Sequence, residues 1–596
     1  MKLRSKNNLY TEVIIPALFV YMWLSNTAKT DSFHNVYVLC ALLGVLCIFD
    51  NYKHRICVSR GVNVTAGVLG AVFAVATVVA NYFLFEPIYS LLNWFNIVCS
   101  LAGGFFLAYH VLLCGINRLP LSINTDTVRR KHSVVFFLLC WGSIGGVFLL
   151  YLFFTAYPGY LTTDSINSLT QIRTGVYLNN NPYWYTVLIR FFIQLGEGLF
   201  RDINAAVACY STSQILILSA CFAYGLVTLY QAGIPMWCIA ATYVVYTFLP
   251  YNLAYSVTMW KDILFGASAL LIVASLYRIL KKIGRSGLLN YLVFVIGAIG
   301  FCLMRTNGWY AYLVTSVLVW LLYWRRNRRL CIVMLVVLIL CWILINPVLS
   351  ALNVGETDFV ETLSVPLQQI ARVIANGCLL APEDEAFLAQ IFDLKLVAER
   401  YSPEIVDPIK FETFQWTGKD FLKDNFGEFI RVWLRIGVQY PGEYLKAWVE
   451  LTKGFWNGGY YFWIYLTTTF PDTSGIGGFV MDNPINDLFA ALFRYMEKPV
   501  ILRPLYSIGL HAWIVVACCF VCAAKKRREF ILTIPVLVLL AGLWIGTPVY
   551  AEYRYAYPMF TSCPIILLAS MFSGESLCNG KCGAEHTMQV PEQEVI

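Results

Sequence analysis

The stretch SVVFFLLCWGSIGGVFLLYLFFTA, residues 133–156, contains no charged residue and decides the fold class. A helix of this composition is long enough to cross the hydrocarbon core of a bilayer, which needs about 20 mostly apolar residues. The polar loop YPGYLTTDSINSLTQIRTGVYLNNNPYWYT, residues 157–186, follows directly and carries a single carboxylate, Asp164. The sequence therefore joins a membrane-spanning segment to a polar loop whose lone acid needs an explanation.

The composition extends this reading to the whole chain. Of the 596 residues, 59% are hydrophobic and 13% are charged, whereas soluble domains average about 45–50% apolar and about 25% charged residues. The formal net charge is +8, but Lys and Arg lie in short clusters between apolar runs, as signals of membrane orientation do. These features predict an all-α polytopic membrane protein and argue against a nucleic-acid partner.

Cysteine and histidine usage indicates no metal or redox centre. Most of the 19 cysteines lie inside apolar segments, where Cys behaves as a small hydrophobic residue. The isolated CNGKC at residues 578–582 is a weak metal pattern, and the six histidines are scattered along the chain. No imidazole cage and no Ser-His-Asp set is visible.

The length rule predicts about fourteen spans, and the first is expected to stay uncleaved. They are residues 11–27, 35–50, 62–84, 88–115, 133–156, 205–230, 237–256, 262–280, 289–305, 309–324, 330–348, 503–523, 530–548 and 555–573.

The basic clusters test this count, because cytoplasmic loops hold an excess of Lys and Arg. The N-terminal cluster and the basic loops at 51–60, 118–132, 278–285, 325–329 and 525–529 all fall on one side of the membrane. We therefore expect both termini in the cytoplasm of a bacterial cell with the protein in its plasma membrane. To keep this parity, residues 184–200 must form an interfacial helix that does not cross.

The predicted organisation has five parts. They are N-terminal transmembrane helices (1–132), a catalytic transmembrane core (133–348) with a first outer loop (157–204), an extracytoplasmic or interfacial region (349–502), C-terminal transmembrane helices (503–573) and a cytoplasmic tail (574–596). The 349–502 region is too long for a simple loop, so it forms either a packed cap or a functional lid.

The topology brings five polar motifs to the outer face. They are Asp164 in TTDSIN, Lys261 and Asp262 in TMWKDILF, Arg305 and Asn307 in MRTNGWY, Gln368 and Arg372 in ETLSVPLQQIAR, and Glu552, Arg554 and Tyr555 in YAEYRYAYP. Ionisable groups at membrane depth are costly and usually face a cavity, a partner or a pathway. Simpler explanations stay open at this point: snorkelling for the arginines, a pairing of Asp262 with Lys261 or another cation, and a helix N-cap for Asp164.

A lipid-phosphate substrate would use such a set. Cations neutralise the phosphate, which Arg matches bidentately, and a carboxylate can activate an acceptor hydroxyl as a base. The polyprenyl tail of a lipid-linked sugar would lie between apolar helices. The motifs thus favour transfer of a sugar from a polyprenyl-phosphate-linked donor to a glycan or lipid acceptor.

The segments GYLTTDSINSLTQIRTG and NPYWYTVLIRFFIQLG resemble the first outer loop of the GT-C superfamily of membrane glycosyltransferases. The resemblance implies a GT-C-like bundle of about 13–14 helices, with Asp164 as the first-loop acid, Pro182 as the second-motif proline and Asp262 as the later acid. Many relatives have His before that proline, where this chain has Asn181. The segment SVPLQQIAR also resembles an uncharacterised group of Gram-positive bacterial multispanning proteins related to this superfamily.

We accordingly predict Asp164 and Asp262 as catalytic residues. The predicted substrate-binding residues are Lys261, Arg305, Asn307, Gln368, Arg372, Glu552, Arg554 and Tyr555. Asp262 could instead hold a divalent cation, and no other cofactor is implied. A transporter or flippase, or a polymerase, of lipid-linked glycans is the alternative; a transporter would carry polar residues deep in its helices, which this chain lacks.

Overall fold

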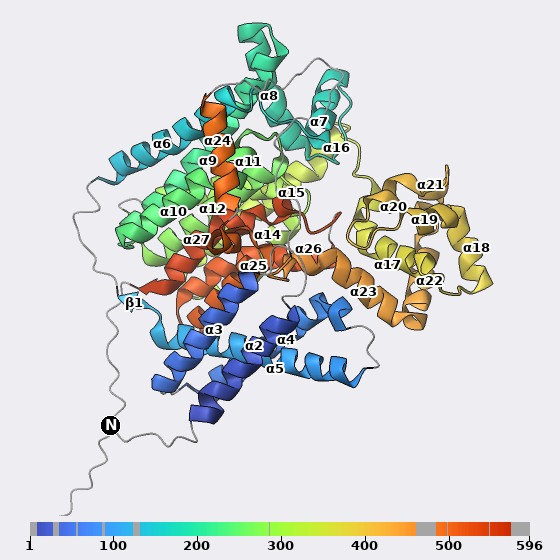
Figure 1. Ribbon diagram of the computed structural model, residues 1–596. Coiled ribbons are helices and arrows are strands. Elements are labelled where there is room, and N and C mark those ends of the chain that lie inside the picture. The colour runs from blue at the N-terminus through green and yellow to red at the C-terminus, as the bar shows by residue number, and fades with distance from the viewer. Residues whose placement is uncertain are drawn as a thin grey trace, which may run out of the picture.

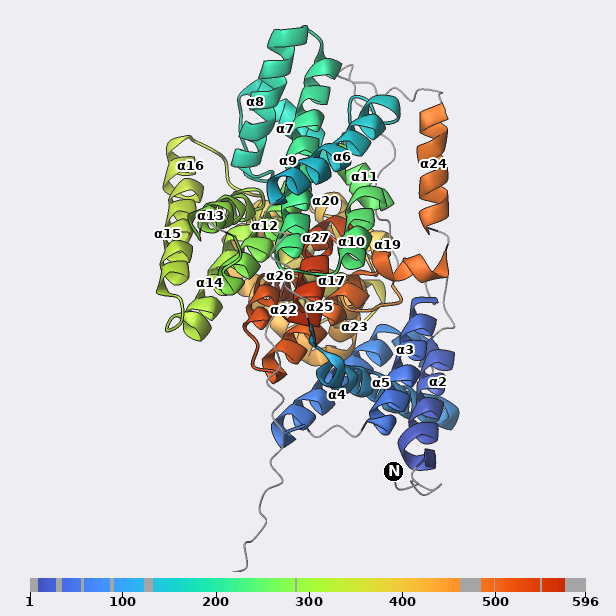
Figure 2. The ribbon, with the colours of Figure 1, turned by 90° about the vertical axis from the view of Figure 1, so that its left-hand side faces the viewer.

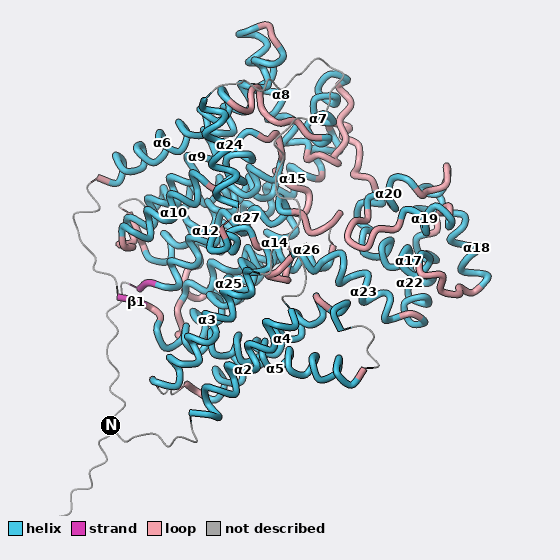
Figure 3. Tube along the Cα trace, in the orientation of Figure 1, coloured by secondary structure: helices cyan, strands magenta, loops and turns pink. Residues whose placement is uncertain are grey.

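The computed structural model describes residues 9–27, 35–54, 58–85, 90–122, 132–284, 287–460, 484–497, 499–546 and 549–573. Across these ranges the regular structure is helical, apart from two short strands, β1 (Leu121–Ser122) and β2 (Phe572–Ser573), which pair in parallel (Figure 3). Figure 1 shows a group of N-terminal helices, a central bundle and a smaller helical domain beside the bundle. The predicted all-α polytopic membrane fold is confirmed.

The N-terminal group packs around one long helix. Its elements are η1 (Tyr10–Ile14), α2 (Ile15–Thr27), α3 (Asn35–Lys53), α4 (Arg60–Ala80), η2 (Tyr82–Phe85) and α5 (Leu91–Arg118). Helix α5 contacts α2, α3 and α4. It approaches α2 closely at Gly103, where a Cβ atom would collide with the Phe19 carbonyl and the Trp23 side chain. Small residues allow such close helix packing in membranes, where lipid is as apolar as the side chains.

The central bundle is built around α12 (Lys261–Lys281). The surrounding elements are α6 (Ser133–Phe154), α9 (Ile203–Gln231), α10 (Met236–Phe248), α11 (Pro250–Val257), α13 (Gly287–Leu303), α14 (Gly308–Tyr323), α15 (Arg328–Ile345), α16 (Pro347–Ala351), α25 (Ile508–Ala524), η7 (Arg528–Thr533), α26 (Ile534–Ile545) and α27 (Tyr553–Met571). Helix α12 contacts α9, α13 and α27, and 94% of the residues in its apolar stretch are buried inside the protein. A helix enclosed on all sides must be apolar all round, which explains why its few charges lie at its ends.

Eight helices within the described ranges are long and apolar enough to cross a membrane, and they coincide with eight of the fourteen predicted spans. They are Val36–Lys53, Arg60–Ala80, Leu91–Arg118, Ser133–Phe154, Ile203–Gln231, Lys261–Lys281, Arg328–Ala351 and Arg528–Ile545. Four further apolar helices, α10, α13, α14 and α25, are shorter. Of the other two predictions, α2 has 13 residues and α27 contains two internal prolines.

The first outer loop forms two helices, α7 (Thr163–Thr174) and α8 (Tyr183–Phe200). The loop is joined to the start of α12, because the Tyr160 amide donates to the Val257 carbonyl at 2.9 Å and the Met259 amide to the Tyr160 carbonyl at 3.0 Å. Buried apolar side chains of α7 and α8, including Leu169 and Ile189, pack with α9 in one cluster. This packing places the beginning of α7 beside the beginning of α12.

Residues 359–455 form a separate helical unit, which we call the outer domain after the face on which the sequence predicts it. It comprises η4 (Phe359–Leu363), α17 (Ser364–Ala375), α18 (Pro382–Ile391), α19 (Leu394–Arg400), α20 (Asp407–Glu412), α21 (Gly418–Asp424), α22 (Phe426–Gln439), α23 (Pro441–Thr452) and η5 (Lys453–Phe455). Its buried apolar residues, such as Leu367, Ile370 and Phe429, form a core of their own. The predicted 349–502 region therefore contains a packed domain.

The end of that region returns to the bundle. Helix α24 (Pro484–Glu497) lies along α6 and α11, on the side opposite α15 and α16 in Figure 2, and η6 (Val500–Tyr506) follows it. The rings of Phe489 and Phe493 pack on Tyr151 with centroid separations of 5.0 and 5.7 Å. The stretch 461–483, which includes the end of the aromatic sequence FWNGGYYFWIY at 455–465, lies outside the described residues.

Candidate functional site

The start of α7 presents Asp164 without using it as a cap. Thr162 is the N-cap, and its side chain and that of Ser165 form a reciprocal capping box. The Ser165 hydroxyl also donates to the Met259 carbonyl at 2.7 Å, which holds α7 against the segment before α12. Asp164 occupies the second helical position, where the helix dipole favours an anion. The N-cap explanation for Asp164 is therefore wrong, and its carboxylate is left to interact with other elements.

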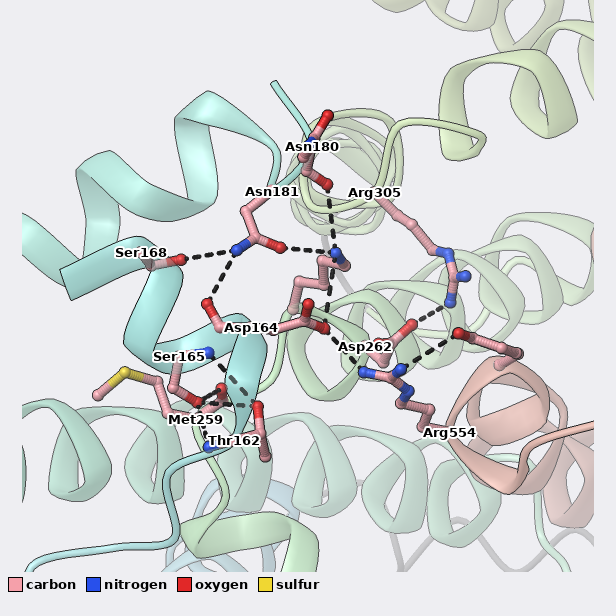
Figure 4. A network of polar contacts seen from close by, with 12 residues as sticks. Thr162, Asp164, Ser165, Ser168, Asn180, Asn181, Met259, Asp262, Arg305 and Arg554 are labelled. Carbon is pink, nitrogen blue, oxygen red and sulfur yellow. Dashed lines mark hydrogen bonds and ion pairs between the residues drawn. The ribbon is translucent and has the colours of Figure 1, made fainter. Parts of the chain in front are cut away.

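Two cations from different helices meet the Asp164 carboxylate (Figure 4). Arg554 Nη1, at the start of α27, donates to Asp164 Oδ2 at 2.8 Å, and Lys261 Nζ lies 3.7 Å from the same oxygen. The side chains of Arg554 and Lys261 are each 15% exposed. Segments almost 400 residues apart in sequence thus converge on one carboxylate.

Asp262 pairs with a different cation from the neighbour suggested by the sequence. Its Oδ1 accepts a hydrogen bond from Arg305 Nη1, and both side chains are buried. Its second oxygen, Oδ2, is buried and has no hydrogen-bond partner. Asp262 therefore orients Arg305, while its neighbour Lys261 forms an ion pair with Asp164.

Aromatic faces and a third carboxylate hold the arginines in place. Arg554 Nε donates to the buried Glu552 carboxylate at 2.6 Å. The Arg554 guanidinium lies over the Trp260 and Tyr555 rings, 4.8 and 5.0 Å from their centroids, and Arg305 lies 4.3 Å from the Tyr555 centroid. Such contacts favour a cation over an aromatic face. Tyr555 therefore sits against both guanidinium groups.

Asn181 links the first outer loop to the cluster. Its amide nitrogen donates to the Asp164 backbone carbonyl at 2.8 Å and to Ser168 Oγ at 3.2 Å, and its oxygen accepts from Lys261 Nζ at 2.8 Å (Figure 4). The next residue, Pro182, is the N-cap of α8. Asn181 thus positions Lys261, a role that requires an acceptor and no titratable group.

The outer domain reaches the cluster through two connections that the sequence did not reveal. The Asp358 amide donates to Asn180 Oδ1 at 2.8 Å, and the Val406 amide donates to the Val549 carbonyl at 3.2 Å. The second contact places the start of α20 beside the chain that leads into α27. Asp407, the first residue of α20, has a buried Oδ1 with no hydrogen-bond partner.

Asp164 and Asp407, which both lie outside the membrane-spanning segments, differ in pKa. Burial raises the pKa of Asp164, but the positive charges of Lys261 and Arg554 outweigh burial and hold that pKa at about 2. Burial raises the pKa of Asp407 to about 6, because the nearest cation, Lys410, offsets it only in part. The hydrogen bond from Val406 to Val549 places Asp407 beside the stretch of chain that leads to Arg554. Asp407 is a site residue that sequence reasoning missed, since its own stretch, SPEIVDPIK, has no distinctive pattern.

Three predicted site residues lie apart from this cluster. Gln368 is fully buried, and its amide donates to the Pro403 carbonyl at 3.0 Å. Arg372 pairs with Glu443 at 2.8 Å inside the outer domain. Asn307 precedes α14, and its Oδ1 is buried without a hydrogen-bond partner. No contact of these side chains with Asp164 or Arg554 is present among the described residues, so the structure does not unite the ten predicted positions into one site.

The cluster is a poor cage for a divalent metal ion. Among the described residues, no group of three or more His, Cys, Asp or Glu side chains could hold one. Asp164 and Asp262 are each bound by cationic side chains instead. Metal sites of carboxylates need several oxygen ligands aimed at one point. The arrangement suits an anionic ligand that replaces the carboxylates as the binding partner of the same cations.

Comparison with known proteins places the chain in a family. A family model described as a family of unknown function, DUF6020, matches residues 172–583. No curated protein and no solved structure matches the chain. The matched range covers more than half of the chain and includes Asn181, α12, the outer domain and Arg554, although Asp164 lies just before it. The chain belongs to the DUF6020 family.

Proposed function

We propose that the protein is a membrane glycosyltransferase that moves a sugar from a polyprenyl-phosphate-linked donor to a glycan or lipid acceptor at the outer face of a bacterial plasma membrane. The observation that carries this proposal is the convergence of Lys261, Arg305 and Arg554 at the start of α12. Three cations gathered in a largely buried space are costly unless they serve an anion. Asp164, Asp262 and Glu552 balance them in the absence of that anion.

The two arginines suit the donor phosphate. A guanidinium offers two parallel N–H donors to phosphate oxygens and is always charged. Contacts with Trp260 and Tyr555 fix the planes of both groups before the donor arrives, so less entropy is lost on binding. The polyprenyl tail would lie along the apolar helices around α12.

The acidities assign different roles to the two acids. A carboxylate whose pKa is about 2 is a weak base, so Asp164 orients the cations and the acceptor. Asp407, whose pKa is about 6, is better matched to proton abstraction near neutral pH. In the proposed step, Asp407 takes the proton of an acceptor hydroxyl and the resulting oxygen bonds to the anomeric carbon. The bond from that carbon to the phosphate oxygen breaks, and polyprenyl phosphate leaves with the electron pair, held by Arg305 and Arg554.

The test compares a deletion strain complemented with wild type, Asp164→Asn, Asp164→Ala or Asp202→Asn. Asp202 is the matched control, since it is an exposed acid that caps α9 by accepting from the Ala205 amide at 2.7 Å, and Asn is an equally good N-cap. Mass spectrometry of lipid-linked sugars and envelope glycans is the readout, with equal membrane levels of each variant confirmed by immunoblot.

We expect both Asp164 variants to lose one sugar from an envelope glycan while its polyprenyl-phosphate donor accumulates, and Asp202→Asn to match wild type. Unchanged glycans in both Asp164 variants would overturn the proposal. Accumulation of a complete glycan on its lipid carrier, with no sugar missing, would instead identify transport or polymerisation.

A further inference from the structure

A polar pocket lies where η2 meets the outer domain, and none of the residues of the cluster around Asp164 lines it. The pocket has a volume of about 580 Å³ and opens between η2, α17, the segment 401–405 and the end of α23. Ligand pockets commonly have volumes of roughly 300–1,000 Å³ and combine apolar walls with a few fixed polar groups. This pocket is therefore large enough for two or three sugar rings.

The carboxylates in and beside the pocket outnumber its cations. Its cations are Arg372 and Lys453, and its carboxylates are Glu404 and Glu450. Lys453 Nζ lies 2.9 Å from Glu404 Oε1 and also pairs with Glu450, while Arg372 pairs with Glu443 just outside the lining. Three carboxylates thus face two cations, and their net negative charge disfavours a phosphate but not an uncharged ligand; around Asp164, by contrast, three cations face three carboxylates. The charge balance favours a neutral occupant.

The apolar part of the wall is aromatic. Tyr82 and Phe83 project from η2, and Tyr401 faces them from the outer domain. Arg372 Nη1 donates to the Tyr401 hydroxyl at 3.3 Å, and Lys453 Nζ lies 5.9 Å from the Phe83 centroid. Aromatic rings pack on the C–H faces of sugar rings, while carboxylates, a guanidinium and an ammonium exchange hydrogen bonds with hydroxyls that both donate and accept. This combination fits a polyhydroxylated ligand.

The pocket is connected to the cluster by a short piece of chain. Residues Ser402 to Ile405 form one wall, and Asp407 follows two residues later. Buried Gln368 holds this wall by donating to the Pro403 carbonyl, which gives a structural role to a residue that sequence analysis placed among the substrate ligands. The pocket wall and Asp407 therefore belong to the same short stretch of chain.

We propose that this pocket binds an uncharged, polyhydroxylated saccharide, which serves as the acceptor glycan. The role of this saccharide as the acceptor rests on the proposed function, whereas saccharide binding to the pocket does not. Arg372 then contacts the acceptor, at a distance from the donor phosphate, and the outer domain is a glycan-binding domain.

The experiment measures binding to the purified full chain in lipid nanodiscs by saturation-transfer NMR, with no donor present. The neutral probes are maltotriose, cellotriose and chitotriose, and inorganic phosphate is the charged probe. The variants are Phe83→Ala, Glu404→Gln and the control Trp416→Ala, which removes a fully exposed aromatic side chain of the outer domain outside the pocket. Size-exclusion profiles confirm that each variant is folded.

We expect at least one neutral probe to bind, Phe83→Ala and Glu404→Gln to weaken it by roughly three- to tenfold, and Trp416→Ala to bind as wild type does. Phosphate should not displace the sugar. Failure of every neutral probe to bind, displacement by phosphate, or equal binding by Phe83→Ala would each overturn the inference. Asp164→Asn should retain sugar binding, so a failure of the transfer reaction and a failure of the pocket give different results.

Discussion

Replacement of Arg554 by Met tests whether the cluster is a coupled set of buried charges. Arg554 bonds Glu552 at 2.6 Å and Asp164 at 2.8 Å, and it joins the start of α27 to the start of α7. Without it, Asp164 keeps Lys261 at 3.7 Å, but Glu552, with 4% of its side chain exposed, loses its ion-pair partner. The variant therefore leaves one buried carboxylate uncompensated.

Loss of one member of a buried ion pair costs about 3–5 kcal/mol, so we expect a loss of that size in the free energy of unfolding. Arg431→Met is the control, because Arg431 pairs with Glu428 at 3.0 Å but its side chain is 76% exposed, and exposed pairs contribute about 0–1 kcal/mol. The double variant Arg554→Met/Glu552→Gln should recover at least about 1 kcal/mol, since both charges are then gone.

Unfolding can be followed by far-UV circular dichroism as SDS is titrated into mixed detergent micelles at neutral pH. A loss under about 1 kcal/mol for Arg554→Met, or strict additivity in the double variant, would refute the coupled-charge description. If Arg554 holds the donor phosphate as proposed, its loss should lower the rate in the transfer assay by about 10²–10³-fold.

Three further outcomes are expected. The wild-type kcat/KM should fall as the pH drops through about 6, when Asp407 becomes protonated, and Asp407→Asn should lose this pH dependence. The raised pKa means that the charged form of Asp407 destabilises the fold. Asp407→Asn should therefore be more stable than wild type above pH 6. The lowered pKa of Asp164 stabilises the fold above pH 3.8, and this contribution is lost as the pH falls toward about 2; thermal denaturation of Asp164→Asn should lack that part of the pH dependence. Lys410→Met, which breaks a pair of a fully buried lysine with Glu361 at 2.7 Å, should lower the melting temperature more than Lys419→Met, whose lysine is 40% exposed; equal shifts would contradict this ranking.

Local composition was sufficient to predict the helical membrane fold. A run such as residues 133–156 specifies a span on its own, because transfer of apolar side chains into lipid depends on composition and length. The parity of the basic loops predicted residues 184–200, the region of α8, as a helix that does not cross, and the apolar runs located the polar ends of α12 and α27. Helix lengths were less predictable, since Pro250 divides the predicted span 237–256 into α10 and α11.

The pairing of charges was decided only by the tertiary structure. The sequence left either Lys261 or another cation as the partner of Asp262, and the packing of α12 on α13 brings Arg305 to Asp262 and leaves Lys261 for Asp164. The packing also places Asp407, at the start of α20, beside the chain that leads to Arg554, and it pairs Arg372 with Glu443 inside the outer domain. Direct ion pairs need their atoms within about 4 Å of each other, so the partners depend on how helices distant in sequence pack, which residue types and spacing along the chain do not encode.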